Sequence, residues 1–452
     1  MEALVSKFRG SSLDARFMRS SVFTMGGYAM AQVLRLASNL ILTRLLFPEA
    51  FGMMALVSVI MQGLAMFSDV GVGPSIMQSK RGDDQKFLDT AWTIQVIRGV
   101  VLWLTACLLA IPVSTLYGEP LLAWILPCAG ITLFITGFNP TRLESANRHL
   151  LMGRLTGLDL AVQAVTVVIT ICLAWYLESV WALVISGIIS SLLVLTAYNI
   201  FLPGQRNRFQ WEREAAQELI GFGKWIFLST ICGFLYMQGD KLLIGKFLTL
   251  EQFGIYNIGF FLASFPLLMG GMMTRKLLIP LYRERPPSES LENFRSLQKM
   301  RFFLTAGMMA LTGGLSAAGV VLIDVMYDPR YLMAGAVVVL IAAMQMPQIL
   351  VMTYEQAALA TGDSRRFFIL SAARALLTLG CLYVGLRLGG LFGALVGQGV
   401  AGLAAYPFVV WLARHAKAWD PKHDAVYACV ATAIIVLALW INFDAVAELA
   451  AQ

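Results

Sequence analysis

A stripe of polar side chains runs along the first apolar segment, which we expect to form a helix over residues 20–43. Its members recur at steps of three and four residues and so share one helical face: Ser21, Thr24, Tyr28, Gln32, Arg35 and Asn39. At 1.5 Å per residue, Arg35 lies roughly 22 Å into this segment, too deep for its guanidinium to reach the end easily. Because arginine does not lose its proton, we expect Arg35 to face water, a carboxylate or an anionic ligand.

Later apolar segments also contain ionisable or amide side chains. They are Asp69 near the end of the second segment, Gln95 and Arg98 in the third, Asp240 and Lys241 in the seventh, and Gln345, Gln348 and Glu355 in the tenth. An ionised group inside a bilayer costs from ~3 to more than ~10 kcal/mol, so such residues are functional candidates by default. Asp69, Asp240 and Glu355 are candidates for proton or cation coupling. The alternative is that these charges form ion pairs that fix helix packing, and the sequence leaves both interpretations open.

The composition is that of an integral membrane protein. Of the 452 residues, 58% are hydrophobic and 13% are charged, against ~25% charged in soluble domains. A helix needs ~20 mostly apolar residues to cross a bilayer. About thirteen segments meet this requirement: 20–43, 50–71, 90–116, 121–139, 156–176, 180–202, 222–245, 252–274, 301–323, 332–354, 367–386, 391–412 and 425–443. We therefore predict an all-α polytopic membrane protein with about 13 transmembrane helices.

The basic residues alternate from loop to loop. Of the 34 Lys and Arg residues, 27 lie in the N-terminal segment and the loops on its side, 4 lie in the opposite loops, and 3 lie inside predicted helices. Cytoplasmic loops are enriched in basic residues, so the N-terminus is predicted to be cytoplasmic. The net charge of +7 then reflects topology, and nucleic acid is not expected as a partner.

Two short segments of the chain resemble each other. Residues 44–52 (RLLFPEAFG) and 246–254 (KFLTLEQFG) align without a gap at an offset of 202 residues, each after the first helix of a six-helix set. Six is even, so both sets have the same orientation, as in parallel-repeat transporters, whose substrate sites lie between the lobes. The predicted organisation is a six-helix lobe (1–202), a cytoplasmic linker (203–221), a second six-helix lobe (222–415) and an appended C-terminal helix (416–452).

Neither a catalytic nor a metal centre is expected. The six cysteines are scattered without metal-ligand spacing and are predicted to be small core residues. His149, His415 and His423 all fall in predicted basic loops. The outer loops, at roughly 5–10 residues each, are too short for an active site, and no glycine motif for phosphate binding follows a strand. The chain is therefore predicted to be a transporter that uses no cofactor, and not an enzyme.

Several segments resemble a known family. Residues 41–56 (ILTRLLFPEAFGMMAL) look like the signature of bacterial polysaccharide-biosynthesis flippases, which belong to the multidrug/oligosaccharidyl-lipid/polysaccharide exporter superfamily. Residues 69–78 (DVGVGPSIMQ) are similar to the junction between the second and third helices of the family. Residues 240–248 (DKLLIGKFL) and 253–259 (FGIYNIG) are similar to the entry into its second lobe. The resemblance extends from about residue 15 to residue 415.

The resemblance implies a V-shaped bundle of two lobes that opens alternately to either side of the bacterial inner membrane. Its substrate would be an oligosaccharide repeat unit on an undecaprenyl pyrophosphate carrier, used for exopolysaccharide or O-antigen-type polymers. Membrane lipids, a polysaccharide polymerase and export machinery would be its partners. The central cavity of the family is cationic; Arg35 fits it by position and Arg98 less well, with Tyr28, Gln32 and Asn39 beside them. Guanidinium groups suit phosphate. Family members often have fourteen helices, whereas thirteen are predicted here.

Two other functions remain open. An ion-coupled exporter of small cationic or amphipathic compounds shares the superfamily fold, but it would line its first lobe with carboxylates. Arg35 therefore favours an anionic substrate. A membrane scaffold within a polysaccharide assembly complex would instead close its polar stripes into ion pairs.

Overall fold

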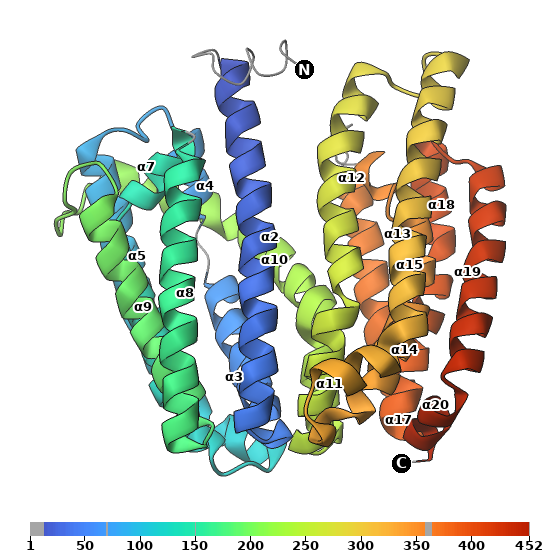
Figure 1. The fold of residues 1–452 in the computed structure, drawn as a ribbon. Coiled ribbons are helices and arrows are strands. Elements are labelled where there is room, and N and C mark those ends of the chain that lie inside the picture. The colour runs from blue at the N-terminus through green and yellow to red at the C-terminus, as the bar shows by residue number, and fades with distance from the viewer. Residues whose placement is uncertain (1–12, 69–70, 150, 358–363, 452) are drawn as a thin grey trace. The chain divides into compact units, whose positions relative to one another are not determined.

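The described part of the chain is helical, with turns and irregular connections (Figure 1). The computed structural model describes residues 13–68, 71–149, 151–357 and 364–451, and no strand occurs among them. The chain folds into two compact units: Met1–Leu46 with Val57–Ile231, and Phe47–Leu56 with Cys232–Gln452. The predicted all-α class is confirmed. The predicted domains 1–202, 203–221, 222–415 and 416–452 stay a prediction.

The first unit is built from paired helices. Those that lie wholly in it are α2 (Leu13–Leu45), α4 (Val72–Gln78), α5 (Gln85–Tyr117), α6 (Leu122–Gly137), α7 (Arg142–Arg148), α8 (Met152–Leu177) and α9 (Trp181–Phe201). Two further helices, α3 (Pro48–Phe67) and α10 (Arg213–Phe247), have a part in each unit. Glycines bring paired helices close together: a methyl group added at Gly99 of α5 would lie 3.1 Å from the Cα of Gly137 of α6.

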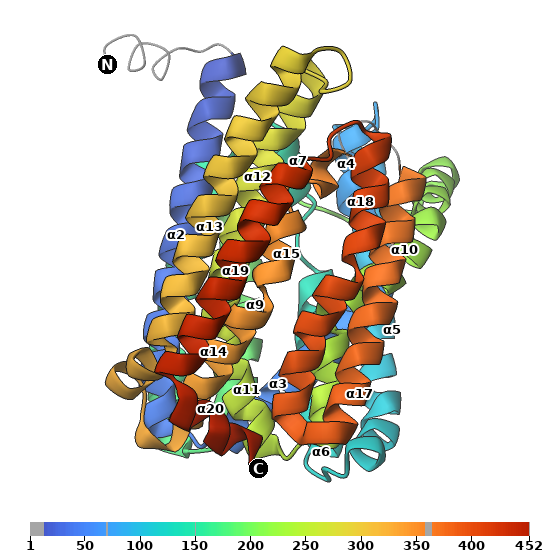
Figure 2. The same ribbon diagram turned by 90° about the vertical axis from the view of Figure 1, so that its right-hand side faces the viewer.

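The second unit contains the rest of the helices. They are α11 (Leu250–Ala263), α12 (Phe265–Glu284), α13 (Leu291–Met326), η1 (Pro329–Tyr331), α14 (Met333–Met344), α15 (Met346–Val351), α17 (Ser364–Ala404), α18 (Tyr406–His415), α19 (Pro421–Ile441) and α20 (Phe443–Ala450). In Figure 2, α19 runs beside α13 and α14. The backbone of α17 leaves the helical conformation at Gly389 and Gly390, where the φ of Gly390 is 52°, a value that glycine adopts without strain. This kink separates the predicted eleventh and twelfth spans.

The helices are suited to a membrane. Eight of the described helices are long and apolar enough to cross one, or up to ten if each bent pair counts as one span. The bends are 61° between α6 and α7 and 41° between α11 and α12. The second bend precedes Pro266, which lacks a backbone donor. The chain is a multi-pass membrane protein, and the number of 13 spans stays a prediction.

The two repeated segments cross each other within the second unit. A methyl group added at Gly52 of α3 would lie 2.1 Å from the carbonyl oxygen of Leu250, and one added at Gly254 of α11 would lie 1.9 Å from that of Pro48. Pro48 and Leu250 are equivalent positions of the repeat, as are Gly52 and Gly254. The contact is therefore reciprocal, as a local twofold axis between the two copies requires.

The segment between α9 and α10 lies against the start of α5. Alternate backbone amides of this segment donate hydrogen bonds of 3.1 to 3.2 Å to side-chain oxygens of α5: Arg208 to Asp89, Gln210 to Thr93 and Glu212 to Thr90. In the turn before α5, the guanidinium of Arg81 bonds to the carboxylates of Asp84 and Glu212, and it lowers the pKa of the Asp84 carboxyl. The linker is thus held by side chains of the first unit.

A buried polar network holds the start of α19 in the second unit. The two carboxylate oxygens of Asp424 accept four hydrogen bonds of 2.7 to 3.1 Å, from Tyr354, His423, Tyr406 and Trp419. An ionised carboxylate can only accept, so the Nδ1 of His423 is the donor. All four acceptor positions of the Asp424 carboxylate are therefore occupied.

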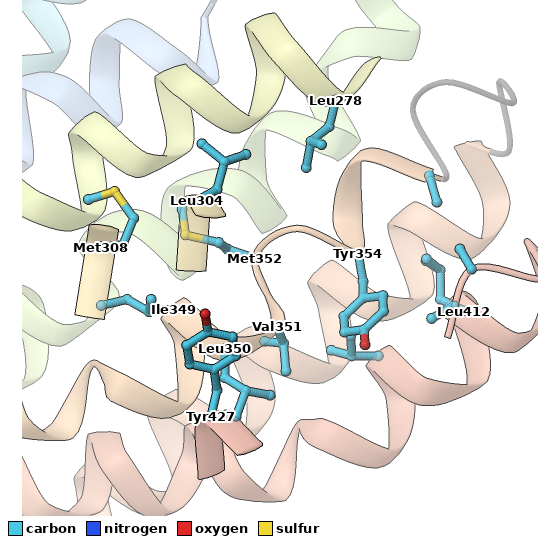
Figure 3. Close-up of a cluster of buried hydrophobic side chains, with 14 of the residues drawn as sticks. Leu278, Leu304, Met308, Ile349, Leu350, Val351, Met352, Tyr354, Leu412 and Tyr427 are labelled. Carbon is cyan, nitrogen blue, oxygen red and sulfur yellow. The ribbon is translucent and has the colours of Figure 1, made fainter. Parts of the chain in front are cut away.

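An arginine extends this network towards α12 and α13. Arg301 is 1% exposed; its guanidinium lies 4.1 Å from the ring centroid of Tyr354 and donates to the carbonyl of Ala418 and the hydroxyl of Tyr282. Around these groups lies an apolar core: Leu278, Leu304, Met308, Ile349, Leu350, Val351, Met352 and Leu412 (Figure 3). The Nε of Arg301 has no hydrogen-bond partner among the described residues, so the two acceptors and the ring of Tyr354 stabilise this buried charge.

The crossing of the repeats predicts that Gly254→Ala destabilises the protein. The new methyl group would meet the Pro48 carbonyl at 1.9 Å, and backbone atoms cannot move aside as a flexible side chain can. Overpacking typically costs about 1–3 kcal/mol, so the midpoint of thermal unfolding should fall for the detergent-purified variant. Gly271→Ala is the matched control, because nothing lies within 4 Å of its added methyl. Equal midpoints for the two variants would contradict the close crossing.

The network predicts a larger loss for Asp424→Ala. Removing the carboxylate breaks the buried pair with His423 and leaves several buried donors without an acceptor. Breaking a buried pair in this way lowers the free energy of unfolding by about 3–5 kcal/mol. We expect little folded, monodisperse protein after detergent extraction. Tyr354→Phe removes one donor and should cost about 1 kcal/mol. The control is Asp444→Ala, at an exposed aspartate of α20; a loss there as large as at Asp424 would show that the network is not responsible.

Candidate functional site

The polar stripe of the first predicted helix lies on α2. The Nε2 of Gln32 donates a hydrogen bond of 2.7 Å to the hydroxyl of Tyr28, one turn earlier. Another face of α2 contacts α8, where the side chain of Gln163 donates a hydrogen bond of 2.9 Å to the carbonyl of Ala31. At 100° per residue, the stripe lies about 100° around the helix from the face that packs on α8. The side chains of Ser21 and Thr24 are outside the described part.

Arg35 is the one charged member of the stripe, and its side chain is exposed at the surface of α2. Within the described residues, no side chain or carbonyl forms a hydrogen bond or ion pair with it, and no carboxylate caps it. Its neighbours Tyr28, Gln32 and Asn39 are half-buried. The closed ion pair that a purely structural role would require is therefore not formed among these residues.

Arg98, the second predicted arginine, differs from Arg35 because it has partners. From α5, its guanidinium donates to Ser68 Oγ at 2.9 Å and to the carbonyl oxygen of Ala65, also at hydrogen-bonding distance. Ala65 lies in the last turn of α3, where carbonyl groups have no intrahelical donor. A cation at a helix C-terminus is favourable. Arg98 thus completes the end of α3, and its proposed role in binding a substrate stays a prediction.

The three acidic candidates are in different surroundings. Asp69 lies outside the described residues. Asp240 of α10 is buried; its Oδ2 accepts a hydrogen bond of 2.7 Å from Tyr256, while its Oδ1 is buried without a partner among the described residues. The neighbouring Lys241 does not bridge to it but lies 5.0 Å from the ring centroid of Phe260. An aspartate with one free oxygen could accept a proton or a cation.

Glu355 has a charged partner. It forms an ion pair with Arg374 of α17, which is 7% exposed. This contact corresponds to the ion-pair interpretation left open by the sequence. The structure thus gives Asp240 and Glu355 separate partners and does not join them in one cluster. Their role in ion coupling stays a prediction.

The surroundings predicted for His423 were wrong. It was placed in a basic loop, but it lies in the first turn of α19, is fully buried, and bonds through Nε2 to Thr305 at 3.0 Å. The local signal was present: Asp420 accepts from the amides of Lys422 and His423, and Pro421 occupies the first helical position. The burial itself depends on a residue 118 positions away.

The prediction that the cysteines are core residues was wrong for Cys172 and Cys429. Cys172 and Cys429 are exposed, and Cys107, Cys128 and Cys381 are half-buried. Lipid tails are as apolar as a protein core, so an apolar residue on a membrane helix need not be buried in protein. The side chain of Cys232 lies outside the described part. No cluster of three or more potential metal ligands occurs among the described residues.

Comparison with known sequences identifies the family. Residues 41–334 match the family described as "Polysaccharide biosynthesis protein". Succinoglycan biosynthesis transport protein ExoT of Rhizobium meliloti (strain 1021) is 24% identical over 227 residues, which are 50% of this chain and 45% of that protein. Teichuronic acid biosynthesis protein TuaB of Bacillus subtilis (strain 168) is 18% identical over 257 residues, 55% and 53% of the two chains. The chain thus matches about half the length of these relatives.

Solved structures show the same fold. The lipid II flippase MurJ in an inward closed conformation has a TM-score of 0.67 and 12% identity, over 95% of this chain and 97% of that one. An inward-facing multidrug resistance MATE family transporter of the MOP superfamily has a TM-score of 0.62 and 14% identity, over 86% and 95%. These neighbours are a flippase and a transporter, not enzymes. The chain therefore has the fold of the MOP superfamily and belongs to the polysaccharide biosynthesis protein family.

Proposed function

We propose that this protein is a flippase that moves oligosaccharide repeat units linked to undecaprenyl pyrophosphate across the bacterial inner membrane. The observation that carries the proposal is Arg35, an exposed arginine without a carboxylate partner among the described residues. It lies on α2, a helix of 33 residues that the sequence predicts to span the membrane. A permanent cation at such a position is costly unless water or an anion reaches it. Of the substrates of this superfamily, a pyrophosphate-linked one supplies that anion.

The rest of the stripe fits a glycan better than a drug. Tyr28, Gln32 and Asn39 offer neutral donors and acceptors, which hydrogen-bond to hydroxyl groups. The planar guanidinium of Arg35 binds phosphate in a bidentate manner. An exporter of cationic compounds would need a carboxylate on this face, and α2 contains none between Ala15 and Leu45. The names of ExoT and TuaB, which refer to succinoglycan and teichuronic acid biosynthesis, support a polysaccharide pathway.

We infer that transport proceeds by alternating access between two lobes related by the repeat, with the N-terminus in the cytoplasm. The division of lobes at 202 and 222, the orientation and the inner-membrane location rest on the sequence. The reciprocal contact of Gly52 and Gly254 supports the twofold relation of the two repeats. A polysaccharide polymerase and export machinery are proposed partners. Asp240 is a better candidate for ion coupling than Glu355, because one of its carboxylate oxygens has no hydrogen-bond partner among the described residues whereas Glu355 is paired with Arg374.

The test is export in cells that depend on this chain for polymer synthesis. Arg35→Gln removes the charge but keeps a polar side chain, and it should reduce surface polymer at least about tenfold, the loss expected for a charge-assisted contact to phosphate. Arg35→Lys keeps the charge without the bidentate geometry, so its surface polymer should lie between the amounts made with the unchanged protein and with Arg35→Gln. The control is Arg154→Gln, which removes an exposed arginine of α8.

Protein levels in the membrane are measured in parallel. Normal export by Arg35→Gln at a normal level would contradict the proposed role of Arg35. If instead polymer export never depends on the chain, while its deletion sensitises cells to cationic compounds, the protein is an exporter of such compounds.

A further inference from the structure

A pocket lined mostly by polar residues lies in the first unit, apart from the stripe on α2. It has a volume of about 340 Å³ and is bounded by the start of α5, by α7 and by the turn at residues 203–205. Among the residues that line it are Thr141, Arg142, Ser145, His149 and Gln205, together with Asp83, whose carboxylate is paired with Arg148 and His149. We propose that this pocket binds a phosphate group, and that the ligand joins α7 to the linker that leads into α10.

The first step of the argument is the way Arg142 is held. This residue is 8% exposed; its Nε donates to the carbonyl of Gln205 at 2.8 Å, and its Nη1 to those of Asn199 and Leu202 at 3.1 and 3.3 Å. These carbonyls belong to the end of α9 and the turn after it. The Nη2 has no partner among the described residues and is not sealed within the protein. The three hydrogen bonds fix the orientation of the Arg142 guanidinium, and its Nη2 remains able to donate to a ligand.

Gly204 allows the turn to close over this arginine. Its φ is 131°, a value that side-chain-bearing residues rarely adopt, and an added methyl would lie 3.1 Å from the Cγ of Arg142. The turn therefore packs on the stem of Arg142 and holds the guanidinium in the wall of the pocket.

Two hydroxyl groups add donors beside the guanidinium. Thr141 Oγ1 accepts a hydrogen bond of 2.8 Å from Asn207, so its own proton can be donated to a ligand. The hydroxyl of Ser145, one turn further along α7, forms no hydrogen bond with the described residues. A tetrahedral oxyanion accepts several donors at once, which matches this set.

The charges around the pocket favour an anion. Arg206 in the adjacent linker is exposed and does not line the pocket, but it directly follows the lining residue Gln205, and its positive charge acts on Arg142. The carboxylates nearby are already engaged: Asp83 with Arg148 and His149, Asp89 with Gln85, Asn207 and the amide of Arg208, and Glu144 with Asn147. None of these contacts neutralises Arg142, so a negative ligand would relieve the repulsion between the two arginines.

Phosphate could come from two sources here. The helix α7 is polar and bends 61° from the apolar α6, so the pocket lies where an apolar span has ended. A soluble phosphate compound or the headgroup of an anionic phospholipid could each present the same group. The shared chemistry is a phosphate group bound by an arginine edge and two hydroxyls.

Binding is measured on the full-length detergent-purified protein with inorganic phosphate, by calorimetry and by the shift of the thermal unfolding midpoint. A second arm uses nanodiscs of zwitterionic lipid with and without phosphatidylglycerol. We expect saturable binding in at least one arm, weakened about tenfold by Arg206→Ala and by Ser145→Ala. Both positions are accessible enough for the variants to fold, which Arg142→Gln does not guarantee. Binding of phosphate alone identifies a soluble source; a requirement for phosphatidylglycerol identifies a lipid.

The matched control is Arg154→Ala. Arg154 and Arg206 are both exposed arginines of the first unit outside the lining, but only Arg206 directly follows a lining residue, Gln205. An equal loss of binding for Arg154→Ala and Arg206→Ala would show only a general charge effect and overturn the proposal, as would the absence of saturable binding in both arms. Arg35→Gln should leave this binding unchanged, so the proposal can fail or succeed independently of the flippase function.

Discussion

An ionised side chain in an apolar medium must find an opposite charge, a set of hydrogen bonds or water, and the rest of this structure depends on how that demand is met. Asp424 meets it with four donors, Arg301 with an aromatic face and two acceptors, and Glu355 with Arg374. These solutions also fix helices, because the partners come from α12, α17, α18, the start of α19 and the segment that follows α15. The same groups that carry charge therefore determine how the second unit packs.

Arg35 is informative because it meets the demand in none of these ways within the described residues. Arg98, on α5 of the same unit, shows the usual alternative, since it donates to the carbonyl of Ala65 and the hydroxyl of Ser68 at the end of α3. Two arginines with the same sequence signature thus have different surroundings. The exposed one needs water or a ligand anion, whereas the partnered one already has its acceptors. This contrast is the physical reason for proposing that Arg35 binds the phosphate of the substrate.

The helices could be predicted from the sequence because apolar length and loop charge are local properties. The first predicted span, 20–43, lies inside α2, and the division between the predicted eleventh and twelfth spans falls at the kink of Gly389 and Gly390. The surroundings of His423 could not be predicted, since its partner Thr305 is 118 residues away. The repeat at an offset of 202 was visible, but sequence similarity does not say that two copies touch. The partners of Glu355 and Asp240 could not be predicted either, because side-chain pairing between helices leaves no local pattern in the sequence.

The chain passes between its two units at three places: after Leu46, within α3 after Leu56, and within α10 after Ile231. The first two flank the segment Phe47–Leu56, which is clamped by the crossing of Gly52 with α11 and by the contact of Phe51 with Tyr331 at 5.9 Å between ring centroids. A backbone contact too close for a methyl group cannot slide without separating. Alternating access, as proposed, therefore requires this segment to move as part of the second unit. The change in conformation must then be taken up where the chain leaves that unit, in the turn before α3 and in the helices α3 and α10 themselves.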